Sequence, residues 1–292
     1  MSRIRNKNFN FRKRCTIIGL TIGNIAGLML RFMPTWWSFL IFWMIMHTFN
    51  HLAYIAASVY VVEVVGPSKR HYGQIMSIGF GIGYVLSSPI AFGFPHWKNF
   101  TTAFAITSVP VLIILAFLPQ SPRWVYADGR PDDGLEILKS FERWTKATLP
   151  NNLDAEIREI GDTDAVNTKT LTIVDVFKSF HLRKIALLMG FAFIAVTIAY
   201  YGLAYNAAAL PGDLYVNNAI NGAVETLAYI LLMFSMPYIG RKWLTSSTFL
   251  LGGGVCILCA ILLETSNGRQ AMRDAAQWLS FVGKFFVSGC FG

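Results

Sequence analysis

Charged residues are scarce in this sequence. Asp, Glu, Lys and Arg make up 14% of its 292 residues, whereas soluble domains carry roughly 25%. Because a soluble protein needs charge over its whole surface, the shortage excludes an ordinary soluble globular domain. The apolar share is high, at 54%, and the mean hydropathy is +0.47. The composition therefore indicates a chain that lies largely in lipid.

Cysteine is sparse as well, and its four residues all lie in or beside apolar segments. Cys256 and Cys259 have the CxxC spacing of some redox and metal motifs, but within an apolar helix we interpret them as a small buried pair. His47 and His51 have a spacing that can hold zinc. The Glu of zinc hydrolases is missing between them, so we expect polar packing and no metal site.

Signs of enzymatic or nucleic-acid chemistry are also missing. The glycines at 79, 81 and 83 and at 252–254 resemble a dinucleotide fingerprint, but neither set follows a strand. Small residues let membrane helices pack closely, which explains them. The net charge of +9 sits in loops and forms no basic stripe with aromatics. With no nucleophile–base pair in view, we expect neither an enzyme nor a cofactor.

Long apolar stretches are what the sequence does contain. A helix needs about 20 mostly apolar residues to cross a bilayer. Seven complete stretches meet this need, and an eighth begins near Trp278. The seven are residues 15–33, 37–62, 72–94, 102–118, 185–205, 215–236 and 244–263.

Basic residues alternate between the loops. With a cytoplasmic N-terminus, 20 of the 25 Lys and Arg residues lie on the cytoplasmic side and four on the other. The positive-inside rule therefore predicts a cytoplasmic N-terminus. The chain divides into an N-terminal segment (1–14), four spans (15–118), a cytoplasmic loop (119–184) and an incomplete second set of spans (185–292).

The loop at 119–184 is expected to hold short helices. Ser121 followed by Pro122 is typical of a helix start. A second helix should begin at Asp132 or Asp133. Two more are predicted around 153–160 and 173–180.

Four motifs, in order, resemble solute carrier family 22 of the major facilitator superfamily, which includes organic cation, carnitine and organic anion transporters. They resemble the turn after the family's fourth span, the loop after its sixth, the end of its seventh span with the loop that follows, and its eighth span. The motifs are Glu63–Arg70, Pro119–Trp124, Tyr200–Leu203 with Gly212–Tyr215, and Glu225–Tyr229.

The resemblance covers the chain from about residue 11 to its end. It implies an all-α, partial major facilitator bundle of about eight membrane helices, corresponding to family helices three to ten. It further implies a plasma-membrane carrier that moves a small organic cation or zwitterion, such as carnitine, by alternating access. Na⁺ and H⁺ are the candidate coupling ions. A faint repeat of short basic turns, at 11–14 and 239–242, fits the two related halves of such carriers.

Glu225 is the sharpest candidate for a substrate site. It lies in mid-span, where a carboxylate costs about 3 kcal/mol to insert and so needs a cavity or a partner. We expect it to attract a cationic group or a coupling ion. The structural alternative is a carboxylate paired with Asn221 or Lys284. Lys284 itself lies at depth, either as that ion partner or with its ammonium reaching towards water.

Aromatic residues on the seventh family span are further candidates, because aromatic faces attract ammonium groups. Phe193, Tyr200 and Tyr201 are predicted to line the site, although membrane packing alone explains many such residues. On the fourth family span, the resemblance points His51 and Tyr54 towards the same cavity.

Charged residues at the cytoplasmic turns are candidates for gating contacts. These are Glu63, Arg70, Arg123 and Arg241, and we expect Glu63 to pair with a basic turn residue such as Arg241.

Two alternative functions stay open, and a third is disfavoured. The missing family spans, and Pro237–Tyr238 in place of charged turn residues, favour a chain that does not transport or that partners a full-length carrier. Lys284 and the histidines keep organic anion transport open. A sugar porter should have a Gln-rich seventh span, which Tyr200–Leu203 does not supply.

Overall fold

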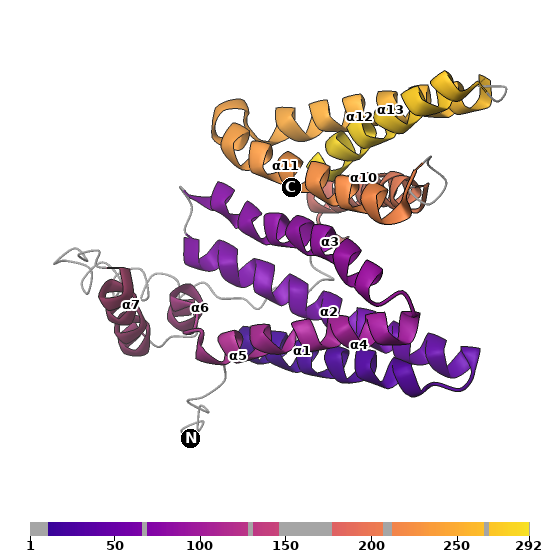
Figure 1. Ribbon diagram of the computed structural model, residues 1–292. Helices are drawn as coiled ribbons and strands as arrows, with labels where there is room; N and C mark the ends of the chain where they lie inside the picture. The colour runs from indigo at the N-terminus through magenta and orange to yellow at the C-terminus, as the bar shows by residue number, and fades with distance from the viewer. Residues whose placement is uncertain are drawn as a thin grey trace. The chain divides into compact units, whose positions relative to one another are not determined.

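The structure is a computed structural model, and it describes residues 11–65, 69–127, 131–145, 177–206, 212–265 and 269–291. All regular secondary structure in these ranges is helical, which confirms the all-α class (Figure 1). The chain forms two compact units. Unit 1 comprises residues 1–70 and 96–170, and unit 2 comprises residues 71–95 and 171–292.

Seven stretches of the described chain are long and apolar enough to cross a membrane, and they match the seven predicted spans. They are Lys13–Phe32, Trp36–Val65, His71–Gly93, Trp97–Leu115, Phe180–Asn206, Leu214–Ile239 and Arg241–Thr265.

The eighth helix, α13 (Gln270–Gly289), differs from its prediction. It begins at Gln270, not near Trp278, because polar residues extend it by two turns. Gln270 donates a hydrogen bond to Asp274 one turn later, at 3.0 Å, a spacing that supports a helix. These polar residues also leave α13 less apolar than the seven spans.

Unit 1 contains α1 (Phe11–Met29), η1 (Leu30–Phe32), α2 (Trp36–Val65), α4 (Trp97–Thr107), α5 (Val109–Phe117), α6 (Pro122–Ala127) and α7 (Pro131–Thr145). Helices α1 and α2 lie against each other (Figure 1). A Cβ at Gly19 would lie 2.8 Å from the Phe49 carbonyl oxygen, and one at Gly23 would meet the Asn50 side chain. The helices therefore approach as closely as small residues permit.

The fourth predicted span is interrupted. It forms α4 and α5, which meet at Ser108, and Pro lies at the start of α5. Proline removes a backbone donor and so breaks the helix ladder. The Ser108 hydroxyl lies 2.6 Å from both the Ala105 carbonyl and Asn24 Oδ1 on α1, which ties the break to its neighbour.

The loop predictions have mixed outcomes. Helix α6 begins at Pro122, as predicted. Helix α7 begins at Pro131, one residue before the predicted Asp132. The predicted helix at 153–160 lies outside the described residues, as does the first half of the one at 173–180.

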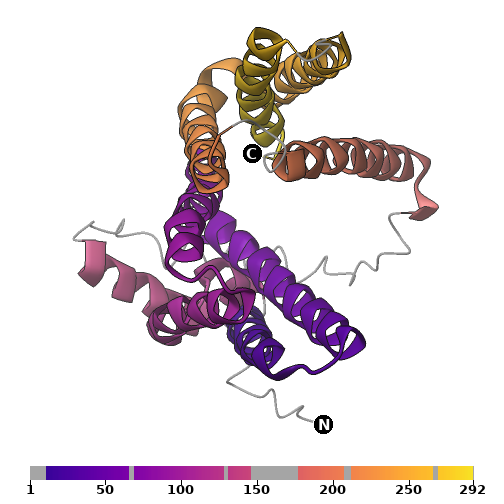
Figure 2. The same ribbon diagram turned by 45° about the vertical axis from the view of Figure 1, so that its right-hand side comes forward.

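Unit 2 contains α3 (Ile75–Gly93), α10 (Phe180–Asn206), α11 (Leu214–Ile239), α12 (Arg241–Thr265) and α13. It also contains all of η2 (Arg70–Gln74) except Arg70, which belongs to unit 1. Helices α12 and α13 run side by side in both views (Figures 1 and 2). They meet at Gly252, where an added Cβ would lie 3.2 Å from Val287. Gly240 has a φ of +81° and forms the tight turn between α11 and α12.

Helices α3 and α11 pack through glycines on both sides. A Cβ at Gly222 would lie 2.7 Å from the Val85 nitrogen, and one at Gly81 would lie 2.5 Å from Thr226 Oγ1. Gly79 and Gly83 would meet no described atom within 4 Å. Only the middle glycine of this set lies at the contact, since residues two apart point in different directions on a helix.

Candidate functional site

A stripe of polar side chains runs along α11. Asn217, Asn221, Glu225 and Tyr229 are four residues apart and share one face. All are at most 3% exposed, and Glu225 is fully buried. The stripe therefore packs against other helices, and it places a carboxylate in the interior of unit 2.

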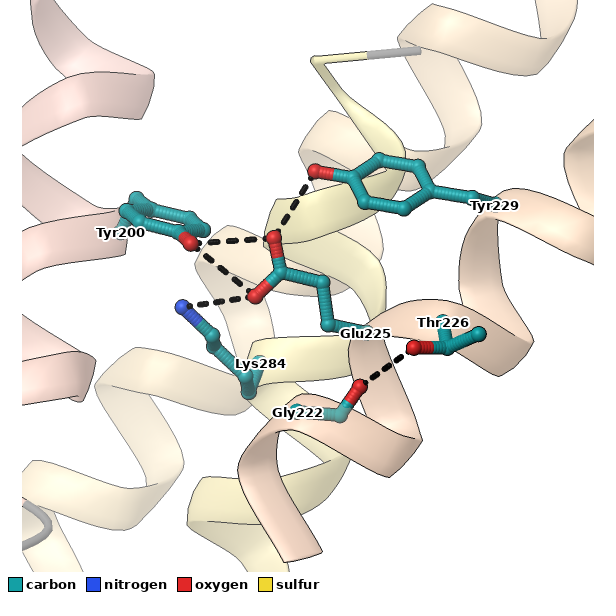
Figure 3. Close-up of polar contacts among 6 residues, drawn as sticks. All are labelled: Tyr200, Gly222, Glu225, Thr226, Tyr229 and Lys284. Carbon is teal, nitrogen blue, oxygen red and sulfur yellow. Dashed lines mark hydrogen bonds and ion pairs between the residues drawn. The ribbon is translucent and has the colours of Figure 1, made fainter. Parts of the chain in front are cut away.

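The Glu225 carboxylate meets side chains from its own helix and two others (Figure 3). The Tyr200 hydroxyl, from α10, lies 3.0 Å from both Oε1 and Oε2 and shares its one hydrogen between them. The Tyr229 hydroxyl, one turn along α11, donates to Oε1 at 2.9 Å. Lys284 Nζ, from α13, lies 3.4 Å from Oε2. Every buried oxygen of the carboxylate thus has partners, as burial requires.

Lys284 is also fully buried, so the two charges are withdrawn from water as a pair. Its ammonium lies 3.1 Å from the centroid of the Tyr200 ring and 5.5 Å from that of Tyr84 on α3. Both rings are within the roughly 6 Å over which an aromatic face attracts a cation. We call Tyr84, Tyr200 and Glu225 the cation cage.

Polar contacts about two turns away from the pair, on the N-terminal side of both Glu225 and Lys284, fix the register of the helices. Gln277 on α13 donates to Asn217 Oδ1 on α11 at 3.1 Å. Asn218 donates to the hydroxyls of Ser87 and Ser88 on α3, at 3.2 and 2.9 Å. Helix α11 is therefore joined by side-chain hydrogen bonds to the helices that supply Lys284 and Tyr84.

Lys284 belongs to a second polar stripe, on α13. Ser280, Lys284 and Ser288 are four residues apart and at most 2% exposed. Their spacing places them on one face of the helix. Polar residues on α13 and α11 thus line a common interface, where the side chains can bind one negative and one positive group.

The other aromatic candidates lie beside this site. Tyr201 contacts the Tyr200 ring at 5.3 Å and is 51% exposed. Phe193 is 60% exposed, and its ring lies 5.6 Å from Phe291. Phe291 contacts Tyr200 at 5.1 Å. The structure thus connects both candidates to Tyr200 through ring contacts but brings neither to Glu225.

The remaining substrate candidates belong to unit 1. His51 and Tyr54 are exposed on α2, and their rings lie 6.2 Å apart. His47 instead packs on Trp43, at 4.4 Å. Within the described ranges, no three His, Cys, Asp or Glu residues cluster as a metal site would require.

The predicted gating residues lie at helix ends. Glu63 is near the end of α2, and Arg241 is the exposed first residue of α12. Arg70 is in η2 and Arg123 in α6, but their side chains lie outside the described part of the structure. The gating contacts stay predictions.

Two residues of the site had no predicted role, Tyr84 and Tyr229. Tyr229 was visible as the end of the Glu225–Tyr229 motif, and its spacing of four from Glu225 was an available signal. Tyr84 left no such signal, because only the packing of α3 on α11 brings it to Lys284. The structural alternative for Glu225 named two partners, Asn221 and Lys284, and the structure pairs it with Lys284. The substrate role of Glu225 stays a prediction.

Known proteins resemble this chain in sequence and in fold. The sequence pattern of the "Sugar (and other) transporter" family matches residues 8–292. The Drosophila melanogaster organic cation transporter protein is 26% identical over 96% of this chain and 52% of its own length. A β-alanine transporter of the same fly is 32% identical, over 81% and 39%. Mouse solute carrier family 22 member 3 is 27% identical, over 82% and 43%.

Among solved structures, the proton:xylose symporter XylE of the major facilitator superfamily superimposes with a TM-score of 0.73 at 16% identity. The match covers 96% of this chain and 65% of XylE. This likeness shows the fold.

A helical bundle with buried intramembrane charges is the architecture of a multi-pass membrane protein of the transporter class. The chain belongs to the sugar (and other) transporter family of the major facilitator superfamily, with solute carrier family 22 proteins among its relatives. The family resemblance of its motifs is confirmed. The chain spans about half the length of the curated relatives it matches.

Proposed function

We propose that the protein moves a small zwitterion across the plasma membrane, within the predicted class of small organic cations and zwitterions. The observation that carries the proposal is the fully buried pair of Glu225 and Lys284, 3.4 Å apart. A lone carboxylate would favour a simple cation. Because Lys284 balances it, the site has one charge of each sign, which suits a substrate with an ammonium and a carboxylate.

The exchange of partners makes such binding feasible. Separating a buried pair without replacement costs about 3–5 kcal/mol. A zwitterion supplies a replacement for both members, since its ammonium pairs with Glu225 and its carboxylate with Lys284. Tyr200 and Tyr229 already donate to Glu225 and would hold it in place during the exchange. Only a substrate with both charges leaves neither residue unpaired.

The names of the relatives support this class of substrate. One relative is a β-alanine transporter, and β-alanine is a zwitterion. Carnitine, predicted from the family resemblance, also carries one charge of each sign.

Access to a closed site requires movement. Glu225 and Lys284 have no exposed surface, so substrate must reach them in another state. Alternating access supplies such a state, and we propose it here with a cytoplasmic N-terminus. Glu225 is also where coupling to H⁺ or Na⁺ would act.

An organic anion is the second candidate, and only Lys284 favours it. Its carboxylate would have to displace Glu225 and leave that residue unpaired in the interior, which is costly. The zwitterion avoids this cost. The uptake experiment described next distinguishes the alternative that the chain does not transport.

The test is uptake of radiolabelled β-alanine and carnitine into cells expressing the chain, with surface labelling to confirm its arrival. Glu225→Gln removes the buried charge, and Glu264→Gln makes the same change at an exposed position of α12. We expect saturable uptake that falls at least tenfold in the first variant and persists in the second. Repeating the assay without Na⁺, and across a pH gradient, identifies the coupling ion.

Two results would contradict the proposal. Equal uptake by Glu225→Gln and the unmodified chain would refute a role for Glu225. A chain at the cell surface with no uptake would identify the non-transporting alternative.

A further inference from the structure

The cation cage already holds a cation, and it belongs to the chain itself. The Lys284 ammonium lies 3.1 Å from the Tyr200 ring centroid, 5.5 Å from that of Tyr84 and 3.4 Å from Glu225 Oε2. Aromatic faces combined with a carboxylate are what a ligand's ammonium requires. In the described structure, no part of this lysine is exposed.

The way in which the ammonium is held is unusual for a lysine. An ammonium group has three donors, yet Nζ makes no hydrogen bond within the described structure. It is held by attraction to one carboxylate and two rings. A quaternary ammonium ion has no donor and depends on these same interactions. The cage therefore supplies what such a ligand needs, in the place where Lys284 lies.

We propose that Lys284 is a tethered cation that fills the cage and determines specificity. A ligand with only a positive charge would have to expel Lys284 and leave its ammonium unpaired in the interior. A ligand that also carries a carboxylate gives Lys284 a new partner. The second half of this inference rests on the proposed zwitterion function, whereas the occupation of the cage by Lys284 does not.

Removing the tether should open the cage to a free cation. Lys284→Ala deletes the propylammonium portion of the side chain and leaves Tyr84, Tyr200 and Glu225 unchanged. We expect the purified full chain with this substitution to bind radiolabelled tetramethylammonium saturably, at least tenfold more tightly than the unmodified chain. Adding Glu225→Gln should abolish the gain, because it removes the attracting charge.

Two further variants separate cage occupancy from general disturbance. Lys284→Arg keeps a cation in place and should not bind tetramethylammonium. Lys242→Ala makes the same deletion at an exposed position of α12 and should behave like the unmodified chain. A folded Lys284→Ala chain that gains no tetramethylammonium binding would overturn the proposal, as would equal binding by the unmodified chain.

Lys284→Ala leaves a buried carboxylate unpaired, so folding itself becomes a readout. If the variant aggregates, its monodisperse yield is measured with and without n-propylammonium, which replaces the deleted atoms. Recovery of the folded chain supports the proposal, and no recovery at any concentration overturns it.

These results are independent of transport. A gain of tetramethylammonium binding in a chain without zwitterion uptake would leave the cage assignment standing and refute the proposed function. Zwitterion uptake without any gain of tetramethylammonium binding would support the proposed function and overturn the cage assignment.

Discussion

The interaction between Glu225 and Lys284 should be measurable as a coupling energy. At 3.4 Å and an effective dielectric constant of about 20, two unit charges attract by about 5 kcal/mol. Lys284→Met keeps a long side chain but leaves the Glu225 carboxylate unpaired. Removing one member of a buried pair costs about 3–5 kcal/mol, so we expect a destabilisation of that size. Glu225→Gln should cost a similar amount.

The double variant tests the reasoning. Once both charges are gone, no buried charge lacks a partner, so Lys284→Met with Glu225→Gln should be far less destabilised than the sum of the single changes. The assay is denaturant unfolding of the purified chain in mixed micelles, with Lys242→Met as an exposed control. Additive effects, with a coupling below about 0.5 kcal/mol, would refute the pair as described.

Three further predictions follow from packing, hydrogen bonding and charge. Gly81→Ala places a Cβ 2.5 Å from a side-chain oxygen of α11 and should lower the free energy of unfolding by about 1–3 kcal/mol. Gly83→Ala places its Cβ in open space and should leave the free energy of unfolding unchanged. Equal effects of the two substitutions would contradict the packing of α3 on α11. Tyr229→Phe removes a donor to Glu225 and should cost about 1.5–3 kcal/mol in the same assay, so an unchanged stability would contradict that bond. An epitope inserted after Pro95 should be labelled on intact cells, and labelling only after permeabilisation would reverse the predicted orientation.

The sequence was sufficient for features with a strong one-dimensional signal. Apolar runs of about 20 residues located the seven spans. The acidic residue Glu225 within such a run was enough to predict a buried carboxylate with a partner, because burial of a charge demands one. The family motif then pointed to Tyr200, which proves to be one of its hydrogen-bond donors.

Other features depend on tertiary contacts, or on single residues whose effect is lost when hydropathy is averaged over a whole span. Tyr84 comes from another helix, and only the glycine-mediated packing of α3 on α11 brings it to Lys284. A search for apolar runs does not find the start of α13 at Gln270, because the first turns of this helix are polar. The break at Ser108 has a visible cause, the proline that follows it, but the surrounding apolar run suggested one continuous span.

The central claim, a site for both charges of one substrate, is tested most directly by competition. Uptake of the labelled zwitterion is measured against the unlabelled compound, its amino alcohol analogue and its carboxylic acid analogue. We predict strong inhibition by the zwitterion and at least tenfold weaker inhibition by either analogue, since each leaves Glu225 or Lys284 unpaired. Inhibition by the amino alcohol as strong as that by the zwitterion would contradict the claim and identify a simple cation site.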